Sequence, residues 1–225
     1  MHGIAHLFLA SLLLAAALGG GGPVLVLIWP ASAVGLVGLA YLLGRPGWLG
    51  KGVTGRRSPA MTALLLPWTA AVGAVLSVTA TKSREAAWHE IADGLFLGRM
   101  ARFDEMPSGV DLVIDLTAEL AADLRVIAGR TYRCVPALDV SALPAEVLNP
   151  LVEEITAWPG RVLIHCTQGR ERSGLVMACV LVRRGLVADI DEAVKLIQSS
   201  RPGVQLSVVP QAAASPVDAE LPEAV

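Results

Sequence analysis

The chain has 225 residues, of which 54% are hydrophobic, 17% charged and 4% aromatic, and its mean hydropathy is +0.59. Soluble domains average about 45–50% apolar and about 25% charged residues. This composition therefore excludes a single ordinary cytosolic domain, and equally a disordered, collagen-like or disulfide-rich chain. The three cysteines, Cys134, Cys166 and Cys179, are too few and odd in number for a disulfide framework.

The charges are divided unevenly along the chain. Residues 1–84 contain no Asp or Glu, and only four Lys or Arg precede Lys82. Residues 81–225 hold the other 14 basic residues and all 20 acidic residues. We therefore expect a membrane region at 1–84, a mildly acidic folded domain at 85–208 and a disordered tail at 209–225. The acidic balance of the folded domain argues against a nucleic-acid partner.

Three apolar stretches lie in the N-terminal region, at about 4–18, 23–43 and 60–80. A helix needs about 20 apolar residues to cross a membrane, so the second and third stretches are long enough and the first is short. We expect the first two to form a helical hairpin that turns at Gly19–Pro23. A pair of buried core helices is the alternative, which the long absence of charge disfavours.

The segment at 44–59 is basic, and its four cations are Arg45, Lys51, Arg56 and Arg57. Cytoplasmic loops of membrane proteins are rich in positive charge, so this segment is expected to face the cytoplasm. If 60–80 then crosses the membrane, the following domain lies outside. Pro67-Trp68 near the start of 60–80 would suit a segment that lies in the membrane–water interface. In that case the domain stays on the cytoplasmic side.

Strand and helix patterns alternate after the apolar stretches. A hairpin is expected at 88–98, with its turn at Asp93-Gly94. The other expected strands are 110–116, 132–136 and 161–165, and the expected helices are 120–128, 145–158, 174–184 and 190–199. This alternation predicts an α/β fold with a mostly parallel central sheet flanked by helices.

The most informative stretch runs from Ile164 to Gly174 and reads IHCTQGRERSG. It lies between a buried strand and a helix, so residues 167–172 are expected to form a tight loop at the N-terminus of that helix. Such a loop presents backbone N–H groups to an anion of phosphate size. The helix dipole and Arg172 favour the thiolate of Cys166, so the loop is expected to bind a phosphoryl group beside a sulfur nucleophile.

This stretch resembles the motif of the protein tyrosine phosphatase superfamily, which is His-Cys, five residues, then Arg-Ser-Gly, with Gly169 three residues after the cysteine. Residues 91–98 are similar to the opening strand of dual-specificity phosphatases, and 193–202 to their late helix, which ends in Arg-Pro. Over about 87–205 the chain is identified as a dual-specificity phosphatase-like domain on an N-terminal membrane segment. The cysteine-phosphatase fold is the α/β fold expected above.

The resemblance implies a role for each matching position. Cys166 is implied as the nucleophile, Arg172 as the bidentate clamp on the phosphoryl oxygens, and Ser173 as the hydroxyl that eases departure of the thiolate. His165 is implied to orient the loop and tune the thiol. No metal or other cofactor is implied, because the loop and its arginine supply the charge stabilisation. The implied phosphate-binding residues are Thr167, Gln168, Gly169, Arg170, Glu171 and Arg172.

The general acid is expected on a loop upstream of the motif. Asp139, 27 residues before Cys166, follows a short strand and precedes a helix, so it is the first candidate. Asp115, at the end of a strand, is the second candidate, and an ordinary turn or capping role is the alternative for both. Cys134 and Cys179 are expected to be ordinary buried cysteines.

We therefore expect a membrane-anchored enzyme that hydrolyses phosphomonoesters of proteins (phosphotyrosine, phosphoserine or phosphothreonine) or of phospholipid head groups through a phosphocysteine. Arg170 beside Arg172, and the stretch 139–144, are similar to phosphatidylglycerophosphate phosphatases of the family, whereas Glu171 departs from their more basic loop. A catalytically inactive phosphate-binding module and a rhodanese-like sulfur transferase are the alternative hypotheses. Because reactive thiolates oxidise easily, the domain is expected on the cytoplasmic face of the plasma or inner membrane.

Overall fold

The computed structural model describes residues 2–20, 22–83, 85–139, 141 and 143–206. They divide into two compact units. The first unit combines residues 1–86 with 114–141, and the second combines 87–113 with 142–225. A part of the chain that follows the apolar stretches therefore packs together with them. The tail expected to be disordered at 209–225 lies outside the described residues.

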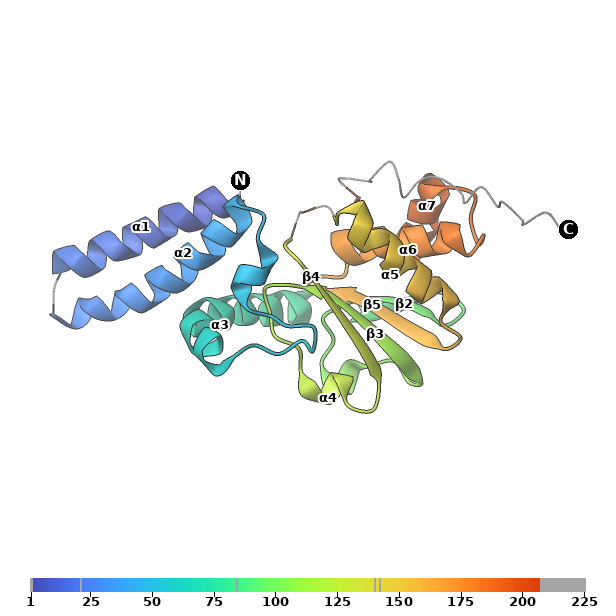
Figure 1. Ribbon diagram of the computed structural model, residues 1–225, viewed down its shortest axis with the longest axis horizontal. Helices are drawn as coiled ribbons and strands as arrows, with labels where there is room; N and C mark the ends of the chain where they lie inside the picture. The colour runs from blue at the N-terminus through green and yellow to red at the C-terminus, as the bar shows by residue number, and fades with distance from the viewer. Residues whose placement is uncertain (1, 21, 84, 140, 142, 207–225) are drawn as a thin grey trace, which may run out of the picture. The chain divides into compact units, whose positions relative to one another are not determined.

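Five strands form one sheet in the order β1-β2-β5-β3-β4, so the expected α/β fold with a central sheet flanked by helices is confirmed (Figure 1). The strands are β1 (Trp88–Ala92), β2 (Leu95–Arg99), β3 (Val110–Thr117), β4 (Thr131–Ala137) and β5 (Arg161–Cys166). The helices are α1 (His2–Gly20), α2 (Ile28–Leu42), α3 (Pro59–Lys82), α4 (Leu124–Ile127), α5 (Ala145–Ala157), α6 (Glu171–Arg183) and α7 (Ile190–Ser200), with short 3-10 helices η1 (Gly22–Leu27), η2 (Pro46–Leu49) and η3 (Phe103–Glu105).

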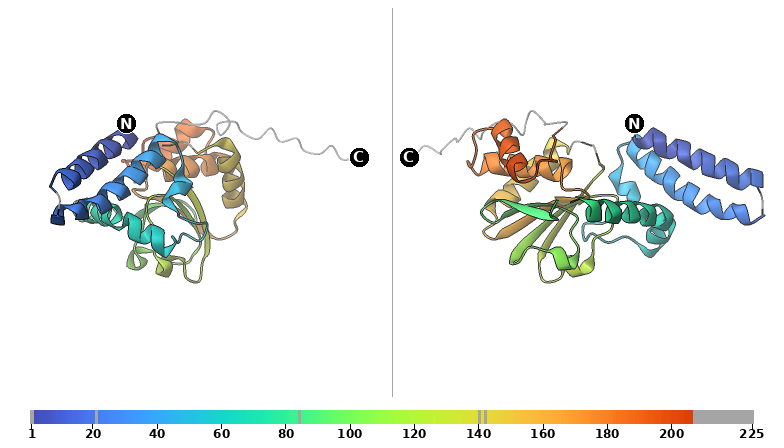
Figure 2. Two further views of the ribbon diagram at one scale, coloured as in Figure 1. Left: turned by 60° about the vertical axis from the view of Figure 1, so that its left-hand side comes forward. Right: turned by 180° about the vertical axis from the view of Figure 1, so that it is seen from behind.

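Helices α1 and α2 of the first unit lie side by side as the expected hairpin (Figures 1 and 2). Their backbones approach closely where side chains are absent. A Cβ on Gly38 would lie 3.0 Å from side-chain atoms of His6 and Leu7, and one on Gly3 would lie 2.9 Å from the backbone nitrogen of Leu42. Small residues allow helices to pack this closely in membranes. Residues 2–20, 22–42 and 59–82 form helical stretches long and apolar enough to cross one.

Helix α3 is continuous through Pro67. It begins after Ser58, whose hydroxyl accepts a hydrogen bond from the Met61 backbone N–H at 3.3 Å, and Pro59 occupies its first position. One side of α3 contributes fully buried Leu65 to the apolar core of the first unit. The buried residues of that core are Ala33, Val37, Ala40, Leu49, Leu65, Ala118 and Leu138.

A buried ion pair joins the basic segment between α2 and α3 to the end of β3. Lys51 Nζ lies 2.7 Å from Asp115 Oδ2, both side chains are fully buried, and Nζ also donates to the Thr117 carbonyl at 2.7 Å. The Asp115 carboxylate also accepts from the Tyr132 hydroxyl at 2.6 Å and from the Thr117 backbone N–H at 2.8 Å. These hydrogen bonds are what a buried charge requires, since burial without them is costly.

Arg57 in the same basic segment is also bound inside the first unit. Its guanidinium donates to the carbonyl oxygens of Ala118 and Glu119, at 2.8 and 2.5 Å. Burial lowers the pKa of Arg57, while Glu119 opposes that shift. Two of the four cations expected as loop charges, Lys51 and Arg57, therefore serve as internal contacts of the fold.

Three sequence-based expectations are wrong in detail. The helix expected at 120–128 comprises only Leu124–Ile127, because Asp123 caps its start by accepting from the Arg125 backbone N–H at 2.9 Å. Helix α6 begins at Glu171, three residues before the expected start, because the loop passes directly into its first turn. On α5, the helical spacing of apolar residues predicts Val147 on the buried face beside Leu148, but Val147 is 37% exposed.

The second unit contains strand β5, which leads into the cysteine loop. Strands β1 and β2 pair antiparallel as the expected hairpin, with Gly94 in the turn at φ +71°. Strand β2 pairs parallel with β5, in a register that sets Arg99 opposite Cys166. Helices α5, α6 and α7 lie on one face of these strands (Figure 1).

The buried ion pair predicts a specific pattern of stability. Lys51→Met leaves the Asp115 carboxylate buried without its cation, so we expect a loss of about 3–5 kcal/mol in the free energy of unfolding. Replacing both partners, Lys51→Met with Asp115→Leu, is expected to recover most of that loss. Denaturant unfolding of the full chain in detergent, with exposed Arg45→Met as control, measures it. Equal free energies of unfolding for Lys51→Met and Arg45→Met would contradict a buried ion pair.

Candidate active site

Cys166 is the last residue of β5, and its thiol lies at the N-terminal end of α6. The residue is 2% exposed. Its Sγ accepts a hydrogen bond from the Gly169 backbone N–H at 3.3 Å and lies 3.3 Å from Ser173 Oγ. A helix N-terminus carries a partial positive charge, so an anion such as a phosphoryl group is stabilised there.

The carbonyl groups of three successive loop residues are held by donors outside the loop. The Thr167 carbonyl accepts from the Met100 backbone N–H at 3.3 Å. The Gln168 carbonyl accepts from Arg201 Nη2 at 3.0 Å, and the Gly169 carbonyl accepts from Arg201 Nε at 2.7 Å. Arg201 is 1% exposed, so this guanidinium is an internal support for the loop.

The orientation of these carbonyls determines the orientation of the amides that follow them. In a trans peptide the C=O and the next N–H point in opposite directions. The N–H groups of residues 168–170 therefore point away from Met100 and Arg201. Among them, the Gly169 N–H points at Cys166 Sγ. Successive N–H groups on one side of a loop form an anion-binding concavity, and here the cysteine sulfur lies beside it.

Gly169 meets two requirements that no other residue type would meet. Its φ is +70°, in the region that side chains disfavour. A Cβ at this position would also collide with the backbone of Gly98 and Arg99 at the end of β2. The loop therefore packs backbone against backbone on β2, and the glycine three residues after the cysteine is explained by packing.

Arg172 lies in the first turn of α6 and is 2% exposed. Its Nη2 donates to Thr167 Oγ1 at 3.0 Å, which ties the guanidinium to the start of the loop. Ser173 is fully buried beside the cysteine, and His165 is buried one residue before it. Gln168 and Arg170 are exposed, and Thr167 and Glu171 are half-buried.

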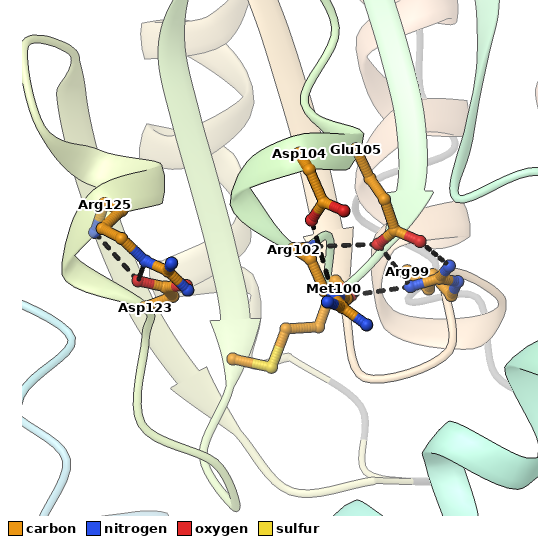
Figure 3. A network of polar contacts seen from close by, with 7 residues as sticks. All are labelled: Arg99, Met100, Arg102, Asp104, Glu105, Asp123 and Arg125. Carbon is orange, nitrogen blue, oxygen red and sulfur yellow. Dashed lines mark hydrogen bonds and ion pairs between the residues drawn. The ribbon is translucent and has the colours of Figure 1, made fainter.

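A polar network holds the segment that follows β2 (Figure 3). Arg99 donates twice to the Glu105 carboxylate, at 2.6 and 3.0 Å, and once to the Met100 carbonyl at 3.2 Å. The Arg102 backbone N–H also donates to Glu105 at 2.9 Å. The Arg99 guanidinium lowers the pKa of Glu105, so the carboxylate stays charged. The network supports the backbone at Met100, whose N–H donates to the Thr167 carbonyl.

Figure 3 also shows the cap of α4, in the first unit. Arg125 Nη2 lies 2.7 Å from Asp123 Oδ2, and this contact lowers the pKa of Asp123. The Arg125 side chain is largely exposed, so the pair contributes little to stability.

The two acid candidates both belong to the first unit. Asp139 follows β4, is half-buried, and its backbone N–H donates to Glu119 Oε1 at 2.7 Å. The fully buried Asp115 carboxylate is engaged by Lys51 and Tyr132, which favours the structural role that the sequence left open for it. The role of Asp139 as general acid stays a prediction.

Two residues that support the site escaped the sequence-based interpretation. Arg201 was noted only as part of the end of a helix, and Glu119 not at all. Both are charged residues, and charged residues are usually exposed. No local pattern distinguishes a buried arginine that binds loop carbonyls from a solvated one. Among the described residues, no group of three or more His, Cys, Asp or Glu side chains is arranged to hold a metal ion.

The comparisons with known proteins agree with the motif. Residues 98–186 match the family described as "Polymorphic toxin system, DSP-PTPase phosphatase". Over these residues, the chain is similar to phosphatases of the dual-specificity type. No curated protein matches the chain.

Similar solved structures include Tk-PTP in its active form, human DUSP28, and PTPMT1 in complex with PI(5)P. Tk-PTP is 28% identical with a TM-score of 0.47, over 54% of this chain and 88% of that chain. DUSP28 is 23% identical with a TM-score of 0.45, over 54% and 85%. PTPMT1 is 20% identical with a TM-score of 0.45, over 53% and 86%.

The three thiols are expected to differ in reactivity. Burial raises the pKa of both Cys134 and Cys179 to about 11, so both stay protonated and unreactive at neutral pH. We expect iodoacetate at neutral pH to alkylate Cys166 first, and inorganic phosphate to slow that reaction. Peptide mapping by mass spectrometry measures the order. Labelling of Cys134 or Cys179 before Cys166 in the folded chain would contradict the assignment of Cys166 as the reactive thiol.

Proposed function

We propose that the protein is a membrane-anchored cysteine phosphatase that hydrolyses phosphomonoesters through a phosphocysteine intermediate. The observation that carries the proposal is the position of Cys166 Sγ, which accepts the Gly169 N–H at the N-terminus of α6. Buried Arg172, held on Thr167, supplies a fixed cation on the same loop. The match of residues 98–186 to a phosphatase family supports the same chemistry.

In the first step the Cys166 thiolate attacks the phosphorus atom of the substrate. A sulfur–phosphorus bond forms while the bond from phosphorus to the ester oxygen breaks. The leaving oxygen takes a proton from the Asp139 carboxyl and departs as a neutral alcohol or phenol. The loop amides and the planar Arg172 guanidinium stabilise the charge on the equatorial oxygens of the phosphoryl group.

In the second step water replaces the sulfur. The Asp139 carboxylate takes a proton from the water as its oxygen bonds to phosphorus, and the phosphorus–sulfur bond breaks. The Cys166 thiolate leaves with the hydrogen bond from Ser173 Oγ, which lies 3.3 Å from Sγ. The sum of the two steps is hydrolysis of one ester to alcohol and phosphate, with the enzyme returned to its starting state.

The substrate is a phosphoprotein or a phospholipid head group. Exposed Arg170 adds a second cation at the loop, which favours substrates with additional negative charge. PTPMT1, one of the similar structures, is described in complex with PI(5)P, an anionic lipid. A membrane anchor would hold the loop near such head groups at high effective concentration. A panel of phosphopeptides, phosphoinositides and phosphatidylglycerophosphate distinguishes these classes.

Substitution at the loop tests the chemistry. We expect Cys166→Ser to lower phosphate release from an aryl phosphate by more than about 10³-fold, because it removes the nucleophile. Asp139→Ala is expected to lower it by about 10²–10⁴-fold while substrate binding persists. Phosphate release by the full chain in detergent measures both effects, with Cys179→Ser as the matched control.

Each alternative hypothesis has its own outcome in the same experiment. Phosphate release that survives Cys166→Ser overturns the proposal. An unsubstituted chain that binds phosphate without turnover indicates the inactive binding module. Transfer of sulfur from thiosulfate to cyanide indicates the sulfur transferase.

Contacts within the first unit bear on the membrane topology. The basic segment 43–58 precedes α3 and residues 114–141 follow it, yet Lys51 pairs with Asp115 and Arg57 binds the carbonyls of 118–119. A single crossing by α3 would put these partners on opposite sides of the membrane. The contacts therefore support an α3 that lies at the membrane surface, with the α1–α2 hairpin as the inserted part.

This topology puts the phosphatase domain on the same side as the basic segment, which we propose to be the cytoplasm. Arg45 and Arg56 remain exposed there, as expected for that side. We expect a C-terminal tag on the full chain to resist external protease in intact cells and to be cleaved after permeabilisation. Cleavage in intact cells would place the domain outside and refute this topology.

A further inference from the structure

We infer that Tyr41 of α2 and buried Glu119 form a clamp that positions the loop of Asp139, so that the apolar helices set the efficiency of proton transfer to the leaving group. The inference rests on the proposed function, because it takes Asp139 as the general acid. It assigns to Tyr41 and Glu119 the role of positioning residues, and it makes the α1–α2 hairpin part of the catalytic domain as well as its anchor.

One carboxylate oxygen connects the helix to the loop. Glu119 Oε1 accepts a hydrogen bond from the Tyr41 hydroxyl at 2.7 Å and another from the Asp139 backbone N–H at 2.7 Å. Glu119 is 4% exposed. Hydrogen bonds to a shielded carboxylate are stronger than those between neutral groups, so displacing either donor is costly. The position of the Asp139 backbone is thereby tied to α2.

The apolar neighbours of these two residues make the same connection independently. Leu138, directly before Asp139, and Ala118, directly before Glu119, belong to one buried core. That core also contains Val37 of α2, with other residues of α2 and α3. Packing in such cores is dense, so a shift of the helices is transmitted to the loop.

Backbone hydrogen bonds at residues 118 and 119 also hold Glu119 in place. Arg57 donates to the backbone carbonyl of Glu119. The Ala118 backbone N–H donates to the Ala137 carbonyl at 3.2 Å, which joins the end of β3 to the end of β4. Glu119 therefore has little freedom to follow the Asp139 loop, and removing the Tyr41 hydroxyl perturbs an otherwise rigid arrangement.

The clamp predicts an effect on one chemical event. Attack by the thiolate does not depend on Asp139 when the leaving group departs without a proton, as dinitrophenolate does. Departure of phenol does require that proton. Catalysis by a positioned acid depends on its geometry. Loosening the Asp139 loop should therefore slow formation of the phosphocysteine from phenyl phosphate and leave its formation from dinitrophenyl phosphate almost unchanged.

The chain provides a matched control for this test. It has two tyrosines, and each donates its hydroxyl to a carboxylate of the first unit. The Tyr132 hydroxyl donates to Asp115 at 2.6 Å and not to Glu119. Tyr41→Phe retains the ring that stacks on His6, with centroids 5.8 Å apart, and removes only the hydroxyl. A merely structural role predicts similar effects of Tyr41→Phe and Tyr132→Phe.

Two measurements on the full chain in detergent test the inference. In hydrogen–deuterium exchange, the Asp139 amide should exchange about five- to tenfold faster in Tyr41→Phe, the factor of about one hydrogen bond. In kinetics, Tyr41→Phe should lower kcat/KM for phenyl phosphate by a similar factor, and for dinitrophenyl phosphate by less than about twofold, because kcat/KM reports only the steps up to departure of the leaving group. Tyr132→Phe should change neither the exchange rate of the Asp139 amide nor the relative rates of the two substrates. Glu119→Ala should exceed the effect of Tyr41→Phe, and Glu119→Gln, which retains an acceptor oxygen, should recover part of it.

The outcomes separate the clamp from the proposed function. Unchanged exchange at Asp139 in both Tyr41→Phe and Glu119→Ala overturns the clamp whatever the activity. An equal fall in kcat/KM for the two aryl phosphates in Tyr41→Phe, or the same selectivity in Tyr132→Phe, overturns the positioning role. If Asp139→Asn itself lowers kcat/KM equally for both substrates, the assignment of the acid fails, and the exchange result still reports on the clamp.

Discussion

The orientation of three peptide groups is the constraint on which the proposed chemistry depends. Hydrogen bonds from Met100 and Arg201 hold the carbonyls of residues 167–169 on one side of the loop. Peptide geometry then directs the following N–H groups to the other side, where Gly169 N–H meets Cys166 Sγ. If these carbonyls were free to turn, the loop would present oxygens and would repel both a thiolate and a phosphate. The nucleophile therefore depends on Arg201, which lies 32 residues after Gly169 in the chain.

Buried charges organise the first unit in a comparable way. Lys51, Arg57 and Glu119 each form hydrogen bonds inside this unit. Together these bonds connect the segment after α2 to the ends of β3 and β4. Apolar helices alone would pack without a fixed register, since nonpolar contacts are not directional. Polar contacts at the helix ends specify one arrangement. Apolar helices held in this way are expected to fold together with the strands they contact, and truncation before residue 86 should expose the core that contains Leu138.

Much of the fold and of the cysteine loop could be predicted from sequence, because the information is local. The strand–loop–helix around Cys166, the hairpin at 88–98 and the apolar helices each follow from composition or spacing within a short window. The failures share a cause. Asp123 makes the expected helix begin late through a side-chain hydrogen bond, and the roles of Lys51, Glu119 and Arg201 depend on partners 20 to 78 residues away. Sequence periodicity carries no information on such pairings.

Direct detection of the covalent intermediate tests the central claim most directly. The full chain would be mixed with dinitrophenyl phosphate, quenched in acid during the first turnover, and its peptides mapped by mass spectrometry. The account predicts a phosphoryl group on the sulfur of Cys166, absent from Cys166→Ser and longer-lived in Asp139→Ala, which lacks the base for the second step. Phosphate release without any phosphorylated Cys166 peptide, or with the phosphoryl group on another residue, would contradict it.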